Sequence, residues 1–378
     1  MTSKKKFLVL FSFIMGSYGF VYTIMQAILY DVQTMYGANA EIMGFSVAAM
    51  CAMQFIFPIL FGVVADKKGK VPVLKIFIAV AFAGCILCAA SNSLAVYVAG
   101  TLVTGTGCTM IESMVVSLLP DIDEERNTQN GNLVQVIFAF AAGMAPIIIS
   151  ILAMINISWR AGFLAIAVVY IGIFTAVCRS KFPRSRLMEN ADTPAKIEFK
   201  ELLKPLFVVL FICMCIYMIM EASFAFFIDS LSTQKGNGNT GAYALACFWF
   251  GMAISRGYIA SRKEVDEMKV IRICYLIAAI TIAAVTLSSN AVLSIILCLL
   301  AGIAFGPTWP TIVAFAGKKY KGSASLISLV VAGGSLGGII GPAITGSVSE
   351  HVSMQAAFII LAAFALAGAG ITLAVKKQ

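Results

Sequence analysis

Long apolar runs, separated by short polar or charged segments, follow one another from end to end of the chain. A helix that crosses a bilayer needs about 20 mostly apolar residues. Inside hydrocarbon each segment must satisfy its own backbone polar groups, which favours helices. Twelve runs fit this description, at 7–30, 42–65, 73–91, 94–119, 132–154, 160–178, 205–228, 241–260, 270–288, 291–315, 324–347 and 354–375. The pattern predicts an all-α membrane protein with twelve transmembrane helices.

The first half of the sequence recurs in the second half at an offset of 195 residues. The matches include Tyr22-Thr-Ile-Met-Gln26-Ala27 with Tyr217-Met-Ile-Met-Glu221-Ala222, and Gly62-x-x-Ala65 with Gly257-x-x-Ala260. The repeat predicts two pseudo-symmetric six-helix bundles, 1–178 and 205–378, joined by a charged cytoplasmic linker at 179–204. Parallel repeats of this kind bind a substrate where they meet, near the middle of the membrane, and expose it to each side in turn.

The composition excludes several classes of protein. Hydrophobic residues make up 60% of the chain and charged residues 12%, whereas soluble domains average about 45–50% and 25%. With the N-terminus in the cytoplasm, all of the 27 Lys and Arg residues except Arg160 and Lys235 fall on the inner side. The net charge of +9 therefore indicates a multi-pass protein of the cell inner membrane with both termini in the cytoplasm, and no nucleic-acid partner.

The sequence does not favour a metal site or a cofactor. It contains a single histidine, His351, and its ten cysteines lie almost wholly inside apolar runs. Cys85 and Cys88 have the spacing of a metal-binding pair, but no second pair or histidine cluster completes a zinc site. We interpret the cysteines as small packing residues.

Two acidic residues lie deep in the apolar runs: Glu112 in the fourth and Glu221 in the seventh. An ionisable residue at such depth is costly, and it is rare unless it faces a cavity or carries a proton. Apolar surroundings favour the protonated form of a carboxyl group, and no lysine or arginine is expected nearby. We interpret both residues as proton-coupling sites, with H+ as the coupling ion. The alternative for each is a permanently protonated side chain that only bonds a neighbouring helix.

Other polar and aromatic side chains in the runs are candidates for binding a substrate. Amides both donate and accept hydrogen bonds, which suits a polyhydroxylated solute, and a tryptophan ring can stack on the apolar face of a ligand. For Gln135, Gln54 and Trp309, helix–helix packing remains an open alternative. The candidate substrate-binding residues are Tyr22, Gln26, Gln54, Asn132, Gln135, Tyr217 and Trp309.

The loop after the second run has a recognisable pattern. Gly62-Val-Val-Ala65-Asp66-Lys67-Lys68-Gly69-Lys70 resembles the signature loop of the major facilitator superfamily, and it lies between the second and third spans, as in that family. We expect Gly62 to permit close helix approach and Gly69 a tight turn. The residues predicted to act in gating at the cytoplasmic face are Gly62, Asp66, Lys67, Gly69, Lys70 and Arg256.

Further motifs resemble those of the fucose:proton symporters within that superfamily. In chain order they are Gly105-Thr-Gly107 followed by Glu112, Asn132-Leu-Val-Gln135, Tyr217-Met-Ile-Met-Glu221, Trp249-Phe-Gly251 followed by Arg256, Trp309-Pro310-Thr311-Ile312, and Gly337-Gly338 followed by Pro342. The resemblance implies the major facilitator fold and proton-coupled import of a sugar. Glu112 would be a protonation site that rearranges the pocket, and Gln135 would contact sugar hydroxyls.

One position departs from that family, whose fucose permease has an acid in the first helix where this sequence has Gln26. Either Glu221 takes over that role, or coupling runs through Glu112 alone, or the substrate differs.

The sequence thus predicts a secondary active transporter: a proton-coupled symporter that imports a sugar or similar small polar solute by alternating access, as a monomer in the lipid bilayer. The main alternative is a drug/proton antiporter, although Thr101 stands where such proteins usually have an arginine. A transporter-like receptor would need an added domain. An enzyme would need a nucleophile and base or metal ligands at depth, so no enzymatic activity is expected.

Overall fold

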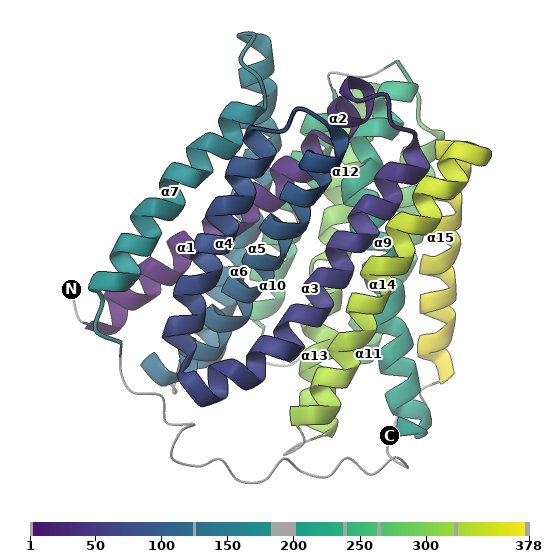
Figure 1. The fold of residues 1–378 in the computed structure, drawn as a ribbon. Helices are drawn as coiled ribbons and strands as arrows, with labels where there is room; N and C mark the ends of the chain where they lie inside the picture. Colours follow the sequence, from purple (N-terminus) through teal and green to yellow (C-terminus); the bar gives the residue numbers. More distant parts are fainter. Residues whose placement is uncertain are drawn as a thin grey trace. The chain divides into compact units, whose positions relative to one another are not determined.

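The computed structural model describes residues 3–123, 126–182, 202–236, 240–262, 266–320 and 324–374. Within these residues the chain consists of helices and short connections, with no β-strand (Figure 1). The predicted all-α class is confirmed. Most of the linker predicted at 179–204 lies outside the described residues.

Contacts between residues divide the chain into two units, residues 1–38 with 49–192 and residues 39–48 with 193–378. The helices of the first part of the chain are α1 (Ser3–Ala27), α2 (Leu29–Met35), α3 (Ala40–Lys68), α4 (Lys70–Ala89), α5 (Leu94–Ile122), α6 (Asn127–Met154) and α7 (Arg160–Arg179). Those of the second part are α9 (Pro205–Gln234), α10 (Gly241–Ala260), α11 (Glu267–Leu287), α12 (Ala291–Phe305), α13 (Thr308–Lys319), α14 (Ala324–His351) and α15 (Met354–Ile371), followed by a 3₁₀ turn at Thr372–Ala374.

Among the described residues, eleven helical segments are long and apolar enough to cross a membrane, one fewer than predicted. The exception is the run at 241–260, which is helical as α10 but less apolar than the others. It carries Arg256 and Ser255 within its last two turns. A charged residue inside a span lowers the mean hydropathy of that span steeply, and Arg256 is the charged residue of α10.

The predicted run at 291–315 is interrupted. Helix α12 ends at Phe305 and α13 begins at Thr308, with a turn at Gly306 and Pro307 between them. Proline has no N–H to donate and its ring crowds the preceding turn, so the helical hydrogen bonds stop there. Broken membrane helices leave backbone groups free to bind other partners.

The same helix partnerships occur in both units. In the first, α1 packs along α6 and α4 packs along α7; in the second, α9 packs along α14 and α11 along α15. These pairs correspond to each other under the 195-residue offset, so the sequence repeat is matched by a repeat in packing.

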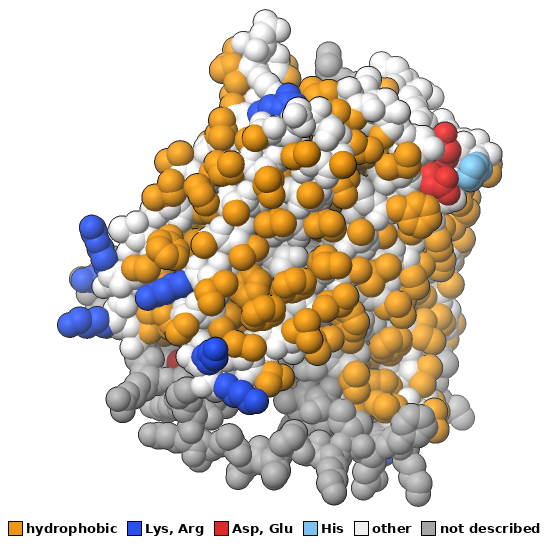
Figure 2. Space-filling model, viewed as in Figure 1, with side chains coloured by type: hydrophobic (Ala, Val, Ile, Leu, Met, Phe, Trp, Pro, Cys, Tyr) orange, Lys and Arg blue, Asp and Glu red, His pale blue; other side chains and the backbone are white. Residues whose placement is uncertain are grey.

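Many large apolar side chains on the helices are exposed. On α7 they include Leu164, Val168 and Ile171, which are 50%, 68% and 54% exposed. Figure 2 shows that hydrophobic side chains cover the helices on the face it presents, with Lys and Arg side chains near helix ends. Such a surface is stable in contact with lipid and not with water.

Candidate functional site

Glu221 lies in the second unit, on α9. Its neighbours on the helix, Met220 and Ala222, are buried to 1% and 2% exposure, whereas the Glu221 side chain keeps an intermediate share of its surface accessible. Glu221 is thus partly exposed as a residue while its neighbours along the helix are enclosed. Such a position suits proton exchange better than a fully enclosed one.

Arg256, from α10, interacts electrostatically with the Glu221 carboxylate. The expectation that no cation lies near this acid is therefore wrong. The sequence places Arg256 close to the end of α10, but an arginine side chain is long enough to carry its charge well away from its own backbone. The guanidinium group offers a delocalised charge and several donors in a fixed plane, which lets it serve a second partner at the same time.

That second partner is the break between α12 and α13. The Arg256 Nε donates a hydrogen bond to the carbonyl oxygen of Gly306 at 3.1 Å. A side chain at Gly306 would collide with the Ser255 hydroxyl and the Met252 carbonyl of α10, so glycine is needed for the two helices to approach. One cation thus bonds a carbonyl at the break and interacts electrostatically with a carboxylate on α9.

Two aromatic residues named as binding candidates lie in the same unit. Tyr217, one turn before Glu221, is 1% exposed, and its ring centre lies 6.2 Å from that of Phe305, the last residue of α12. Its hydroxyl interacts electrostatically with Glu221 and Arg256, but no partner for it lies at hydrogen-bond distance among the described residues. Trp309, on α13 just past the break, is partly exposed.

Glu112 lies in the first unit, on α5, and has a neutral partner. The Gln135 side-chain amide, from α6, donates a hydrogen bond to its Oε1 at 3.0 Å. Both side chains are partly exposed. The structure therefore brings together two candidate residues that the sequence placed in separate helices. Asn132, one turn earlier on α6, is also partly exposed.

The remaining binding candidates in the first unit are more enclosed. Gln26 and Tyr22, on α1, are 1% and 7% exposed, and the Tyr22 ring packs edge-on against Tyr18 with centres 5.8 Å apart. Gln54, on α3, has its amide nitrogen buried, with no hydrogen-bond partner in the described part of the chain. A buried donor of this kind is available to a water or a ligand.

The predicted gating loop forms a tight turn between α3 and α4. Gly69 alone separates the two helices and has φ +95°, a conformation that glycine adopts without strain. The next residue, Lys70, points inward: its Nζ lies 2.7 Å from Asp121 Oδ2 and 2.6 Å from the Ser117 carbonyl of α5. Each side chain of the ion pair is 5% exposed. Lys70 therefore ties the start of α4 to the end of α5.

Other residues of this loop are placed less specifically. Lys67 is exposed at the end of α3, and the side chain of Asp66 lies outside the described residues. A methyl group added at Gly62 would meet no described atom within 4 Å, so the expected close helix approach at Gly62 is not found.

Sequence reasoning missed two features: Asp121 as the partner of Lys70, and the place of Arg256, which bonds Gly306 and interacts electrostatically with Glu221. The Lys70–Asp121 pair could have been found from the sequence. Because α4 and α5 are consecutive antiparallel spans, the start of α4, where Lys70 lies, is next to the end of α5, where Asp121 lies. Among the described residues no group of three or more His, Cys, Asp or Glu is arranged to hold a metal ion.

Comparison with known proteins identifies the family. Residues 7–326 match the sequence model of the Major Facilitator Superfamily. The inner membrane transport protein YajR of Escherichia coli (strain K12) is 29% identical over 134 residues, which cover 34% of this chain and only 29% of YajR. The similarity to YajR thus extends over less than a third of its length.

Solved structures of transporters share the fold. A bacterial homologue of the human lysosomal transporter Spinster superposes with a TM-score of 0.80 at 13% identity, covering 99% of this chain and 97% of the other. The nucleoside transporter NupG gives 0.76 at 13% identity, with 100% of both chains covered. The human organic anion transporter MFSD10 gives 0.74 at 14% identity, covering 98% and 100%. Identities this low establish the fold and leave the substrate open.

The matched residues span most of the chain, and the helical architecture agrees with them. Members of this family are in general transporters rather than enzymes. The chain therefore belongs to the Major Facilitator Superfamily and is a multi-pass membrane protein that moves small solutes by secondary transport.

Proposed function

We propose that the chain is a proton-coupled symporter that imports a small polar solute of the sugar class, with Glu221 as its main coupling residue. The observation that carries the proposal is that Arg256 interacts electrostatically with the Glu221 carboxylate while its Nε donates a hydrogen bond to the Gly306 carbonyl. Protonation of Glu221 removes the negative charge that holds Arg256. The cation then interacts with the break between α12 and α13 alone, so a proton on α9 changes the forces on a neighbouring helix.

Glu112 and Gln135 supply a second element of the proposal. An ionised carboxylate only accepts hydrogen bonds, whereas a protonated one can also donate. Protonation of Glu112 would weaken the 3.0 Å bond from the Gln135 amide, because a neutral carboxyl oxygen is a poorer acceptor than a carboxylate, and the amide could then turn to a hydroxyl group of the solute. Asn132, a turn away on α6 and partly exposed, would contribute a further amide on that helix.

The experiment is solute uptake into proteoliposomes under an imposed pH gradient, after a thermal-shift screen of sugars, nucleosides and small organic anions on the purified protein. A symporter accumulates the solute when the outside is acidic, and a drug/proton antiporter does so when the inside is acidic. Accumulation driven by an acidic interior would overturn symport. A solute that moves equally without a gradient would overturn proton coupling.

We also propose that both termini lie in the cytoplasm, that the host membrane is an inner membrane and that the chain acts as a monomer. The support for the orientation is the charge asymmetry of the sequence, with Arg160 and Lys235 as exceptions on the outer side; the support for an inner membrane is the similarity to an inner membrane transport protein. Membrane-impermeant labelling of single cysteines placed at Lys235 and Lys319 of a cysteine-free variant tests the orientation, because only the first should react from outside. Labelling of the second from outside would contradict it.

A further inference from the structure

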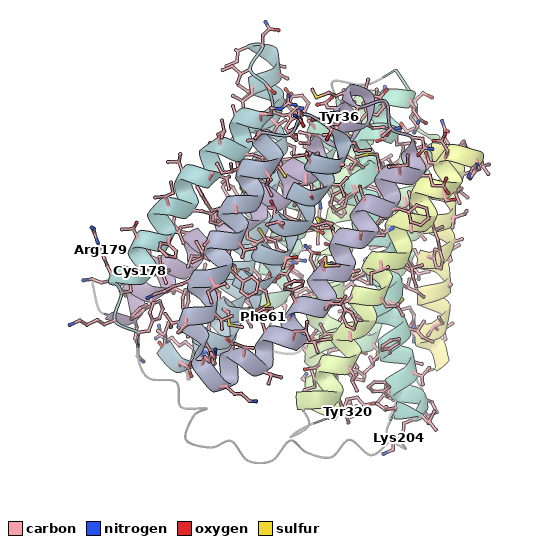
Figure 3. All side chains as sticks on the ribbon, in the orientation of Figure 1. Tyr36, Phe61, Cys178, Arg179, Lys204 and Tyr320 are labelled. Carbon is pink, nitrogen blue, oxygen red and sulfur yellow. The ribbon has the colours of Figure 1, made fainter. Side chains whose placement is uncertain are left out.

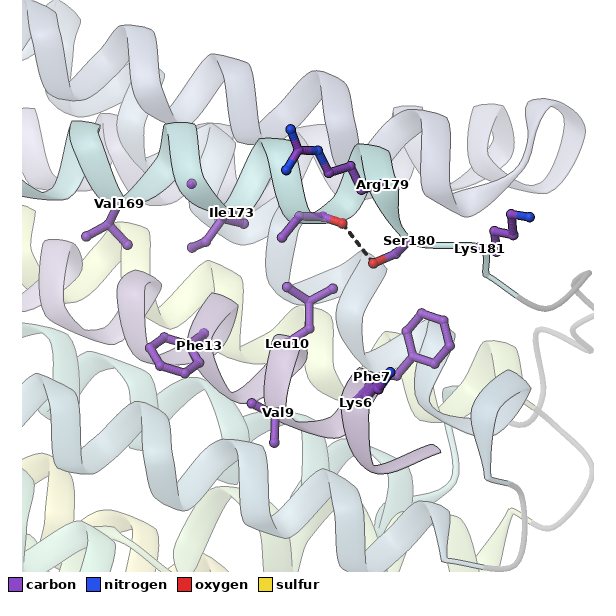
Figure 4. A pocket seen from close by; sticks show the side chains of 12 residues that line it. Lys6, Phe7, Val9, Leu10, Phe13, Val169, Ile173, Arg179, Ser180 and Lys181 are labelled. Atoms are coloured by element: carbon purple, nitrogen blue, oxygen red, sulfur yellow. Dashed lines mark hydrogen bonds between the residues drawn. The ribbon is translucent and has the colours of Figure 1, made fainter. Parts of the chain in front are cut away.

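A groove runs between α1 and α7 in the first unit, with a volume of about 710 Å³ (Figure 4). We call it the α1–α7 groove; its lining consists of Lys6, Phe7, Val9, Leu10, Phe13, Val169, Gly172, Ile173, Ala176, Arg179, Ser180 and Lys181. Along most of its length the groove is apolar. Phe13, Val9 and Val169 are 67%, 47% and 40% exposed, so apolar side chains face outward from the helices that form it.

One end of the groove is basic. Lys6, Arg179 and Lys181 all border it, and all three side chains are exposed. Among the residues that the structure describes, none of those lining the groove is acidic, so three positive charges gather beside an apolar channel. In Figure 4 the three lie toward one end, and Phe13 and Val169 lie toward the other.

The position of these cations is set by the fold. After α7 the chain turns back over α1: the Phe182 ring lies 4.9 Å from that of Phe7 and 6.3 Å from that of Phe11, measured between ring centres. This contact holds Lys181 beside the first turns of α1, while the Ser180 hydroxyl donates to the Ala176 carbonyl at 2.7 Å and closes the end of α7. Figure 3 shows Arg179 at this end of α7.

The groove also has a defined level in the membrane. Both of its helices are apolar enough to cross a bilayer, over residues Lys4–Ala27 and Arg160–Arg179. Lys6 and Arg179 lie at the ends of these segments, where the headgroup region begins, and Phe13 and Val169 lie further in, at the level of hydrocarbon. Basic side chains at this level are attracted to anionic lipid headgroups.

We propose that the α1–α7 groove binds one anionic glycerophospholipid, with the phosphate on Lys6, Arg179 and Lys181 and an acyl chain along Val9, Phe13, Val169 and Gly172. The apolar channel supplies contact for a chain, and the unopposed cations supply the preference for a negative headgroup. Arginine adds a planar pair of donors that match phosphate oxygens.

The test is native mass spectrometry of the full-length protein in detergent, titrated with phosphatidylglycerol or with phosphatidylcholine of the same chains. We expect the wild type to retain one phosphatidylglycerol at least tenfold more strongly than phosphatidylcholine. The triple variant Lys6→Gln, Arg179→Gln, Lys181→Gln should lose this preference. The matched control Lys68→Gln, Lys269→Gln, Lys319→Gln removes three cations outside the groove and should keep it. Equal loss in both variants would show a general charge effect and overturn the proposal.

A second variant separates the acyl chain from the headgroup. A Cβ added at Gly172 would meet no described atom within 4 Å, so α7 accepts a side chain at this position, and Gly172→Phe is chosen to fill the groove while all three cations are kept. We expect it to weaken phosphatidylglycerol binding about as much as the triple variant does. Unchanged binding in Gly172→Phe, or displacement of the lipid by millimolar inorganic phosphate, would show that the basic end binds a free anion only and would overturn the lipid site.

Discussion

Each unit connects a basic side chain to a carboxylate and to a backbone carbonyl, and the two arrangements differ in their access to solvent. In the first unit Lys70 and Asp121 are each 5% exposed and 2.7 Å apart. In the second unit Arg256 and Glu221 are both partly exposed and interact electrostatically. The chemistry is similar, and the greater exposure of the second pair is the reason that we propose it, and not the first, for proton exchange.

The difference separates a structural ion pair from a functional one. Breaking a buried ion pair leaves an uncompensated charge in a medium of low dielectric constant and is strongly destabilising. The Lys70–Asp121 pair is therefore expected to stay formed and to fix the end of α5 to the start of α4. Arg256 and Glu221 are both partly exposed, and we propose that protonation of Glu221 ends their electrostatic interaction during a transport cycle.

The largest effect is expected from Glu221→Gln, which replaces the carboxylate by an amide that stays neutral at every pH. A gradient of one pH unit can sustain about tenfold accumulation per proton, since 1.36 kcal/mol corresponds to a factor of ten. The variant should lose accumulation above equilibrium altogether under an imposed gradient. Asp31→Asn, which neutralises an acid on α2 outside the membrane segments, is the control and should accumulate like the wild type. Wild-type accumulation by Glu221→Gln would remove Glu221 from coupling.

The buried Lys70–Asp121 pair should affect the stability of the protein and not its transport. We expect Asp121→Asn to lower the free energy of unfolding by about 3–5 kcal/mol, because it leaves the Lys70 charge buried and unpaired. The double variant Lys70→Met, Asp121→Leu should recover most of that loss. Denaturant unfolding in mixed micelles measures the first effect, and uptake per folded molecule should stay near the wild-type value. A loss of coupling in the double variant would show that the Lys70–Asp121 pair also takes part in transport, and would contradict its purely structural role.

Arg256→Lys tests whether the second pair acts through its geometry or only through its charge. Lysine keeps the positive charge but has no Nε donor at the position that bonds Gly306. We expect uptake to slow several-fold and stability to fall by about 1 kcal/mol, the usual net value of one hydrogen bond. An unchanged uptake rate would indicate that the bond to the broken helix plays no part in transport.

The architecture was readable from the sequence because hydrophobic length and the 195-residue repeat are properties of whole segments. Single contacts were less accessible. The break at Gly306 and Pro307 was visible as a Gly-Pro pair inside an apolar run, yet the run was predicted as one helix. Gln135 and Glu112 were both named, but their hydrogen bond depends on the rotation of α5 against α6, which periodicity alone does not define. Arg256 was predicted to act in gating, and its interaction with Glu221 was not predicted because it depends on how far the side chain reaches.

Glu112→Gln should have a smaller effect than Glu221→Gln, because the amide oxygen of the variant can still accept the hydrogen bond that the neutral Gln135 side chain donates. We expect exchange of solute between equal concentrations to stay within about twofold of the wild type, while accumulation against a gradient falls. Proteoliposome exchange and uphill uptake, measured on the same preparation, check this. Equal loss of both would instead indicate a role in binding or in the packing of α5 against α6.

The smallest effect is expected at Lys235, whose described hydrogen-bond partners are carbonyl oxygens and include no carboxylate. Lys235 Nζ donates to the carbonyls of Val285 and Ser288, at 2.6 and 2.9 Å, and closes the end of α11. Burial lowers the pKa of the Lys235 amine below its usual 10.5. At a pH between the lowered pKa of the folded protein and the usual pKa of the unfolded chain, the unfolded chain therefore holds more protons than the folded one. The free energy of unfolding should then rise with pH across that window, and Lys235→Met should lack the rise. Melting curves in detergent between pH 8 and about 10.5, with the exposed Lys269→Met as the control, measure it. If the free energy of unfolding rose equally in the wild type and both variants, deprotonation of Lys235 would not be the cause of the rise. A cation whose described partners are carbonyls would then lack the pH response that is proposed for the Arg256–Glu221 pair.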